Sequence, residues 1–422
     1  MKRFLVAGIS LAAMSLAVPA LAQQAGIDPA QVKGKITVIT HFTSYITDGL
    51  FDRWKKEFKA LYPNVEDVDV QGITDYAGTM PTRLTTGDYG DVLDVPTTVT
   101  REELPEFFTP LDNLDLAKDF YYAANYTQDG HVYAFTDGVS VNGMAYNKAA
   151  FTKAGISGVP KTWDELIADM QKLKAAGTIP IVLNMGAGWP LATSDDLAVD
   201  IYGKPTLHAD MMKDAAPFSA DKAYGKALGI YHAWIKDGLT EPDLTANNWE
   251  DSKGWIAGGK AAMWFLGSWS INQIIQEGSV KAGMSNYDPT NIGYFPLPYD
   301  NSGGPYNVDS GPDYPLAVAK NSKNPVTAEA WLAFMLTKSD LSQVAGFIPG
   351  YKPMPPTLAQ MTEFQSYKPN IIQTVADPTE FTNASNSINF GGGKGAQSLM
   401  LADDYDAAVT DLNKQWAGAT GQ

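Results

Sequence analysis

Strand-like and helix-like segments alternate along this chain, and that order limits the folds it can adopt. Residues 35–40 form a β-branched run, and Phe51, Trp54 and Phe58 then recur at helical spacing before Pro63. Further strand-like runs follow at 65–70 and 91–95. A strand–helix–strand order predicts a largely parallel sheet covered by helices, so the predicted class is α/β.

The same alternation continues through the rest of the chain. Asp48 is the expected N-cap of the first helix, and Thr162 with Glu165 forms a capping box for a helix that ends near Gly177. We expect more strands at 179–183, 261–265 and 314–319, and more helices at 221–236 and from Pro325.

The first 22 residues have the three parts of a secretory signal peptide. Lys2 and Arg3 are followed by an apolar run over 4–18 and by the small-residue site Ala20-Leu21-Ala22. The run is too short to anchor the chain in a bilayer. The sequence contains no cysteine to carry a lipid. We therefore expect a protein of the bacterial periplasm that starts at Gln23 and is not a lipoprotein.

Length and charge restrict the architecture and the partners. Removing 22 of the 422 residues leaves 400, more than a single hydrophobic core of about 250–300 residues accommodates, so two lobes are expected. Without Lys2 and Arg3 the formal net charge of −16 becomes −18. Such an acidic surface repels phosphate backbones and anionic lipids. We expect no nucleic-acid partner and no insertion into a membrane.

The familiar catalytic motifs are absent or incomplete. Residues 254–261 have the spacing of a phosphate-binding loop, but they lack its Ser or Thr and precede a strand. Residues 138–142 resemble a nucleophile elbow except for Asn142, where glycine is required. The four histidines have no zinc-binding spacing. The sequence thus predicts no enzyme, no cofactor and no metal. Paired carboxylates such as Asp195-Asp196 keep a secreted carbohydrate-active enzyme as the alternative.

Three segments resemble signatures of one protein family. They are Asp137-Gly-Val-Ser-Val-Asn-Gly-Met-Ala-Tyr-Asn-Lys-Ala-Ala-Phe151 with Pro160-Lys-Thr-Trp-Asp-Glu-Leu166, then Gly259-Lys-Ala-Ala-Met-Trp-Phe-Leu-Gly-Ser-Trp269, then Ala317-Val-Ala-Lys-Asn-Ser-Lys-Asn-Pro325. In this order they are similar to the solute-binding proteins of bacterial ABC transporters, in the carbohydrate-uptake group of the maltose-binding protein.

The resemblance implies a two-lobed periplasmic binding protein fold with a ligand cleft between the lobes and three hinge crossings. The expected first lobe comprises residues 23–140 and 308–346, and the expected second lobe comprises 141–307 and 347–422. The crossings are expected near 140–143, 305–311 and 346–351. The implied protein is a monomer that closes over a sugar, an oligosaccharide or a related polyhydroxy solute and presents it to the permease.

A sugar site needs aromatic faces for C–H groups and polar groups for hydroxyls. Trp269 matches the cleft tryptophan of the family, and Trp189 and Asp94 follow predicted strands at their carboxyl ends, where ligands of α/β sheets bind. The full set of expected ligand contacts is His41, Phe42, Ser44, Tyr45, Tyr76, Asp94, Thr97, Ser140, Trp189, Trp269, Asp309, Gly311, Asp313 and Tyr351. A phosphorylated polyol, such as a glycerol phosphate ester, is the main rival ligand. It would require basic groups, of which Arg83 and Lys352 are the chief candidates.

Overall fold

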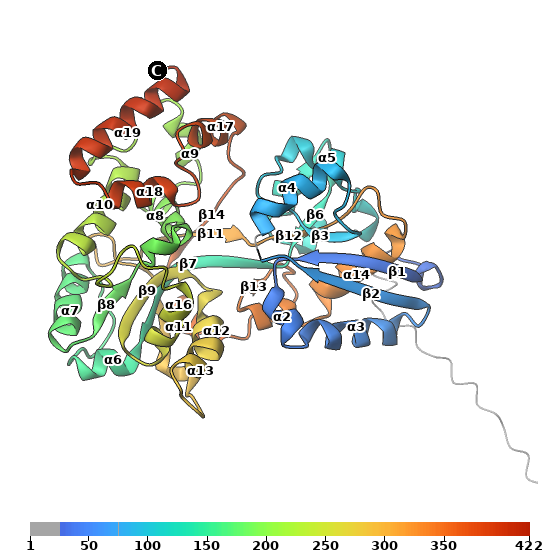
Figure 1. The fold of residues 1–422 in the computed structure, drawn as a ribbon, viewed down its shortest axis with the longest axis horizontal. Helices are drawn as coiled ribbons and strands as arrows, with labels where there is room; N and C mark the ends of the chain where they lie inside the picture. Colours follow the sequence, from blue (N-terminus) through green and yellow to red (C-terminus); the bar gives the residue numbers. More distant parts are fainter. Residues whose placement is uncertain (1–25, 75) are drawn as a thin grey trace, which may run out of the picture.

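The computed structural model describes residues 26–74 and 76–422, so the predicted signal peptide lies outside the described residues. The chain forms two lobes, each built around its own β-sheet (Figure 1). We call the elements around the five-stranded sheet the first lobe and those around the seven-stranded sheet the second lobe. Within the described residues, no helix combines the length and the apolar content needed to cross a membrane.

The sheet of the first lobe is mixed. Its strands, in spatial order, are β2 (Val65–Gly72), β1 (Gly34–Thr40), β3 (Val92–Asp94), β12 (Pro315–Val318) and β6 (Ala134–Thr136). The pairs β1–β2 and β1–β3 are parallel, as the strand–helix–strand order predicts, whereas β12 is antiparallel to both β3 and β6. The sheet is therefore completed by a strand from a distant part of the sequence.

Helices cover this sheet with the apolar residues that the sequence pattern selects. They are α2 (Thr43–Thr47), α3 (Leu50–Leu61), α4 (Tyr76–Thr86), α5 (Leu104–Phe107), α14 (Pro325–Thr337) and α15 (Leu341–Ala345). In α3 the spaced residues Phe51, Trp54 and Phe58 are buried. The expected N-cap was wrong, because Gly49 precedes α3 and Asp48 instead ends the short helix α2.

The second lobe contains a longer mixed sheet. Its main path is β14 (Asn370–Gln373), β11 (Asn307–Pro312), β7 (Gly138–Asn147), β9 (Ala261–Gly267) and β8 (Ile179–Val182), and β10 (Ile292–Phe295) and β13 (Ile348–Pro349) also pair with β7. The strand β7 is long enough to pair with β11 and β13 near its start and with β9 and β10 farther along. A small hairpin of β4 (Thr127–Gln128) and β5 (His131–Val132) belongs to the first lobe.

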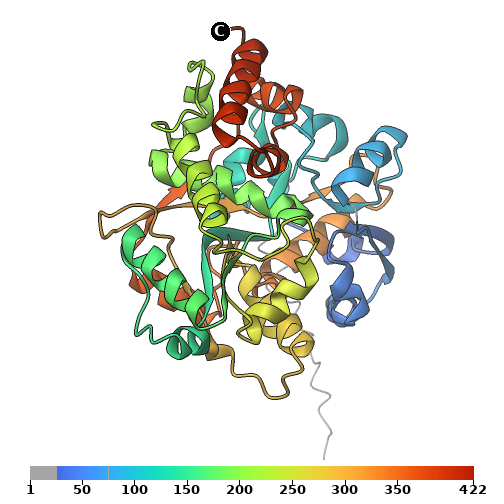
Figure 2. The same cartoon turned by 60° about the vertical axis from the view of Figure 1, so that its left-hand side comes forward.

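Helices surround the second sheet, and the C-terminal helices extend the second lobe at one end (Figures 1 and 2). They are α6 (Lys148–Lys153), α7 (Trp163–Ala175), α8 (Thr193–Tyr202), α9 (Leu207–Met211), α10 (Ala223–Lys236), α11 (Trp249–Ala257), α12 (Ser270–Gln273), α13 (Ser279–Lys281), α16 (Ala359–Ser366), α17 (Thr379–Ser387), α18 (Lys394–Met400) and α19 (Tyr405–Thr420). The predicted cap of α7 is half right. The Thr162 hydroxyl accepts from the Glu165 N–H at 3.2 Å, but the Glu165 carboxylate accepts from the Lys161 N–H at 2.7 Å.

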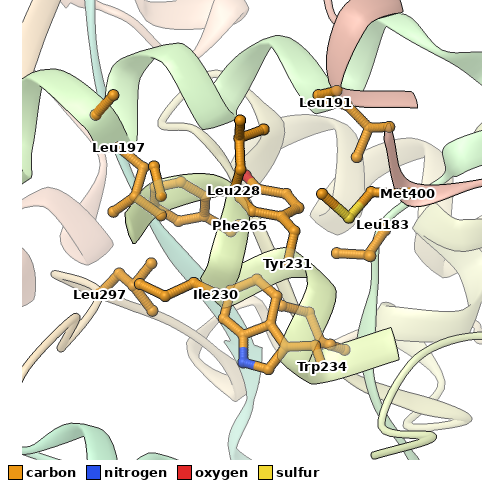
Figure 3. Close-up of a cluster of buried hydrophobic side chains, with 14 of the residues drawn as sticks. Leu183, Leu191, Leu197, Leu228, Ile230, Tyr231, Trp234, Phe265, Leu297 and Met400 are labelled. Atoms are coloured by element: carbon orange, nitrogen blue, oxygen red, sulfur yellow. The ribbon is translucent and has the colours of Figure 1, made fainter. Parts of the chain in front are cut away.

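The core of the second lobe joins its C-terminal helices to its sheet. Leu183, Leu191 and Met400 lie together in this core, beside Tyr231 of α10 (Figure 3). Leu191 belongs to η7 (Trp189–Ala192), a single 3₁₀ turn that follows β8, and Met400 is the last residue of α18. The turn after β8 is therefore fixed by packing from the end of the chain.

The segments that connect the lobes meet at the start of β7. The Gly138 carbonyl accepts from the Asp313 N–H at 2.9 Å, and the Asp137 carbonyl accepts from the Gly350 N–H and from the Ser342 hydroxyl. The chain changes sheet between β6 and β7 and again between β11 and β12. Residues 140–143 thus lie inside β7, and residues 307–311 of the second expected crossing lie inside β11. The exact lobe boundaries stay a prediction.

Candidate functional site

Three tryptophans form an aromatic cluster on the second lobe. Trp189 begins η7 after β8, Trp249 begins α11, and Trp269 follows β9. The ring centroids of Trp189 and Trp249 lie 4.6 Å apart, and those of Trp189 and Trp269 lie 5.9 Å apart. Trp189 remains 44% exposed, so an indole face stays open to solvent. Exposed indole beside further aromatic rings is suited to the apolar face of a ligand.

An open pocket of about 430 Å³ lies against this cluster. Trp189 and Trp249 line it together with Asn247, Glu250 and Asp251. The pocket thus combines two aromatic rings with an amide and two carboxylates. This arrangement can stack on C–H groups and accept hydrogen bonds from hydroxyls.

A glycine lets the cluster fold back onto the crossing strand. A Cβ atom on Gly267 would lie 2.3 Å from Nε1 of Trp269 and 2.6 Å from Oγ of Ser140. No larger residue at this position leaves room for both side chains. The Ser140 hydroxyl is buried and has no hydrogen-bond partner among the described residues.

The first lobe carries a second aromatic and polar group after β1 and β3. Oδ2 of Asp94 accepts from the backbone N–H of His41 at 2.9 Å and lies 2.7 Å from Nδ1 of the same residue. The His41 ring lies 4.6 Å from the ring of Tyr314 and 3.9 Å from that of Phe42, centroid to centroid. Phe42 stacks in turn on Tyr45 at 4.9 Å. We call these residues the histidine group.

The charges around the histidine group are mutually dependent. Burial acts to lower the pKa of His41, but the charge and the hydrogen bond of Asp94 outweigh it, so the pKa is raised. Burial raises the pKa of Asp313 and of the fully buried Asp137, and each carboxyl is repelled by the other acids of the group. The pKa of Tyr45 is raised by burial and by Glu277 of the second lobe. The raised pKa keeps the Tyr45 hydroxyl protonated, so that it can act as a hydrogen-bond donor.

Acidic side chains also gather where α8 touches the crossing strands. The Asp309 N–H donates to Oδ1 of Asp200 at 2.5 Å, and Nδ2 of Asn142 donates to Oδ1 of Asp309 at 3.2 Å. Burial raises the pKa of Asp309 to about 7, with a further contribution from Asp195. Burial together with the charge of Asp309 raises the pKa of Asp196. Asp309 lies on strand β11, Asp195 and Asp196 lie in the first turn of α8, and Asp200 lies near the end of α8.

The structure divides the predicted contacts into separate places. The histidine group contains His41, Phe42, Tyr45 and Asp94, and Tyr76 joins it because its hydroxyl donates to the Asp94 carbonyl at 2.5 Å. The tryptophan cluster contains Trp189 and Trp269, with Ser140 beneath them.

The remaining predicted residues take no part in the ring contacts of either group. Ser44 and Thr97 are exposed. Gly311 pairs with Ser140 between β11 and β7. Tyr351 stacks on Phe120 at 5.4 Å and packs against the core of the first lobe. Which of the predicted residues touch a ligand stays a prediction.

Sequence reasoning missed three residues of these groups. Trp249 opens a helix after a polar stretch at Asn247-Asn248, a signal that strand-based reasoning does not use. Tyr314 follows the predicted Asp313, and Asp137 begins the first family-like segment. Tyr314 and Asp137 could have been proposed from the sequence, because each adjoins a residue or segment already under consideration. Within the described part of the chain, no group of three acidic, histidine or cysteine side chains is placed to hold a metal ion.

Comparisons with known proteins agree on one family. A family model described as bacterial extracellular solute-binding protein matches residues 44–340. The multiple sugar-binding protein of Streptococcus mutans serotype c (strain ATCC 700610 / UA159) is 26% identical over 293 residues, which cover 67% of this chain and 66% of that protein. A Brucella abortus (strain 2308) protein, named as a binding protein, is 30% identical over 231 residues, or 52% of this chain and 51% of its own length. The chain thus spans about half to two thirds of these curated relatives.

A solved structure shows the same architecture over nearly the whole chain. It is a binding protein of an ABC transporter from Bifidobacterium animalis subsp. lactis ATCC27673 in complex with mannotriose. The two structures superimpose with a TM-score of 0.80 at 24% sequence identity, covering 94% of this chain and 97% of the other. This likeness confirms the predicted two-lobed α/β fold class.

Proposed function

Because the chain belongs to the family of bacterial extracellular solute-binding proteins, we propose that it is the periplasmic substrate-binding component of an ABC importer. The proposed ligand is a sugar, an oligosaccharide or a related polyhydroxy solute, which the protein captures between its lobes and delivers to the permease unchanged. The proposed mature protein is a monomer that begins at Gln23, after removal of the signal peptide, and carries no lipid.

The tryptophan cluster is the observation that carries this proposal. Sugars present weakly apolar C–H faces and a rim of hydroxyls, so they need aromatic surfaces and acceptors at the same place. Trp189 and Trp249 supply the surfaces, and Asn247, Glu250 and Asp251 supply the acceptors within one pocket. The sugar ligands named for the streptococcal and bifidobacterial relatives support the same class of ligand.

The histidine group is the proposed partner surface from the first lobe. It offers the aromatic rings of His41, Phe42 and Tyr45, which complement a ligand already stacked on the second lobe. In the proposed closure, residues 23–140 with 308–346 rotate against residues 141–307 with 347–422. A ligand that contacts both surfaces binds the closed state better and shifts the population toward it.

The charges around the tryptophans favour an uncharged ligand over a phosphorylated polyol. Arg and Lys are the side chains that pair with a phosphate, and neither type lines the tryptophan pocket, which instead carries two carboxylates. Lys253 lies 5.0 Å from the Trp249 ring, but its ammonium group is 2.6 Å from Glu277 and 3.3 Å from Glu250. Its charge is thus already balanced by two carboxylates.

A binding screen tests the proposal directly. Thermal unfolding is followed with mannose, mannobiose, mannotriose, glucose, maltose, maltotriose and glycerol 3-phosphate, each at saturating concentration. A true ligand at 100 times its Kd adds about 2.7 kcal/mol to the free energy of unfolding. Stabilisation by glycerol 3-phosphate alone, or by no sugar of this panel, contradicts the proposal.

The same sugars separate a binding protein from an enzyme. After prolonged incubation with the wild-type protein, chromatography is expected to recover each oligosaccharide intact. Release of shorter sugars would instead establish a carbohydrate-active enzyme.

A further inference from the structure

A second cavity, of about 270 Å³, is lined by Ala192 at the end of the turn that carries Trp189. Its walls come from the first residues of α8, from α17 and from the loop that leads into α18. In Figure 1, α8, α17 and α18 lie together in the upper part of the second lobe, and α17 projects toward the first lobe. Nothing in the proposal above uses this cavity.

The walls of the cavity have the chemistry of a sugar site. Asp196, Ser385 and Asn386 supply a carboxyl, a hydroxyl and an amide, and Phe381 and Phe390 supply aromatic surface. This mixture of aromatic and hydrogen-bonding groups repeats that of the tryptophan pocket. Neither Lys nor Arg lines the cavity, so a phosphate or carboxylate on the ligand would find no opposite charge there.

The acids of the cavity differ in how they are already used. Asp195 accepts from the Tyr224 hydroxyl at 2.7 Å and lies 3.1 Å from Nε2 of His208. Asp377 lies 2.6 Å from Nδ1 of the same histidine. The two carboxyls are therefore engaged with protein groups. Asp196 accepts from the side-chain amide of Asn142 and lies beside Asp309 of the crossing strands, and its carboxyl has capacity for a further hydrogen bond from a ligand.

The two cavities share one short turn. Trp189, at the start of η7, lines the tryptophan pocket, and Ala192, at its end, lines the second cavity. At about 2 Å of rise per residue, the turn places the backbones of Trp189 and Ala192 about 6 Å apart. That separation is comparable with one sugar ring.

The glycine run 391–393 explains how the turn and the cavity are held together. Gly391, Gly392 and Gly393 line the cavity. A Cβ atom on Gly393 would lie 2.6 Å from the carbonyl oxygen of Gly188 and 2.8 Å from the nitrogen of Ala192. Gly393 must therefore stay free of a side chain for the loop to pack against the turn that presents Trp189.

We propose that this cavity is a second sugar subsite, which holds the unit next to the one stacked on the tryptophan cluster. The inference rests on the proposed function and narrows it to an oligosaccharide of at least two units. The second unit is uncharged, and its hydroxyls donate to Asp196 and hydrogen-bond with Asn386 and Ser385.

Chain length separates this inference from the proposed function. Calorimetry measures Kd for mannose, mannobiose and mannotriose and for glucose, maltose and maltotriose. The variants are Asp196→Asn and Asn386→Ala. Asn383→Ala is the matched control, since Asn383 is an exposed asparagine on the same helix, α17, that does not line the cavity. Thermal midpoints show whether each variant is folded.

The expected result is a loss of affinity for the disaccharides and trisaccharides alone. Each cavity variant weakens binding of the disaccharide and trisaccharide about tenfold, or about 1.4 kcal/mol, and leaves monosaccharide binding and the Asn383→Ala control unchanged. Wild-type affinity for the longer sugars in both folded variants overturns the inference, and so does an equal loss for sugars of every length. Wild-type protein that binds neither series overturns the proposed function, and the inference with it.

Discussion

Replacing Trp189 by alanine removes the most exposed ring of the tryptophan cluster. A tryptophan side chain presents about 250 Å², and 44% of Trp189 is exposed, so about 110 Å² is available to a ligand. At about 25 cal/mol per Å², full coverage stabilises the complex by about 2.8 kcal/mol and half coverage by about 1.4 kcal/mol. The Kd of Trp189→Ala is therefore expected to rise about 10- to 100-fold.

Calorimetry with the tightest-binding sugar of the screen measures this loss. Trp189→Phe is the control, because it keeps an aromatic face and is expected to retain most of the affinity. The thermal midpoint of Trp189→Ala should change little, since nearly half of the side chain is already in contact with solvent. A folded Trp189→Ala variant whose Kd stays within twofold of wild type would refute the stacking argument.

Three further predictions concern charge and motion. Asp94→Asn removes the negative charge that stabilises protonated His41, so the effect of burial prevails and the pKa of His41 falls, which an NMR titration measures. The same substitution should weaken ligand binding by about 1–2 kcal/mol. An unmoved pKa contradicts the pairing. Burial opposes the proton of His208, but Asp195 and Asp377 raise its pKa from 6.5 to about 10. The stabilisation from this raised pKa is complete below pH 6.5 and is lost as the pH rises toward 10. The thermal midpoint of the wild type should therefore fall over this range by more than that of His208→Gln. Equal falls of the two midpoints would show that His208 does not contribute to stability. Small-angle scattering should give a smaller radius of gyration with a saturating sugar, and an identical radius with binding confirmed would mean that the lobes do not close.

Local patterns predicted the elements better than they predicted the site. The α3 stripe of Phe51, Trp54 and Phe58 and the strand ends at Asp94 and Trp269 follow from spacing along the chain, and the structure contains them. The N-cap predicted at Asp48 was wrong, because Asp48 is the C-cap of a short helix, α2, that the sequence pattern did not predict. Periodicity alone does not reveal such a tertiary preference.

The site depends on contacts between distant segments, which spacing does not encode. Trp249 joins Trp189 and Trp269 only because α11 begins beside the turn after β8. Asp309 meets Asp200 and Asn142 only once β7, β11 and α8 are packed together. The residue types gave candidates, and their grouping required the fold.

The position of β12 has a consequence for how the chain acquires its structure. This strand, at residues 315–318, lies between β3 at 92–94 and β6 at 134–136. Until residue 318 has been synthesised, β3 and β6 each lack a neighbour, and their open edges invite wrong pairing. The first lobe therefore cannot complete its sheet until residues of the second lobe, including β7 to β11, have been synthesised, although its sequence begins first. Because β12 follows β3 and β6 so late in the sequence, folding of the first lobe should be slow.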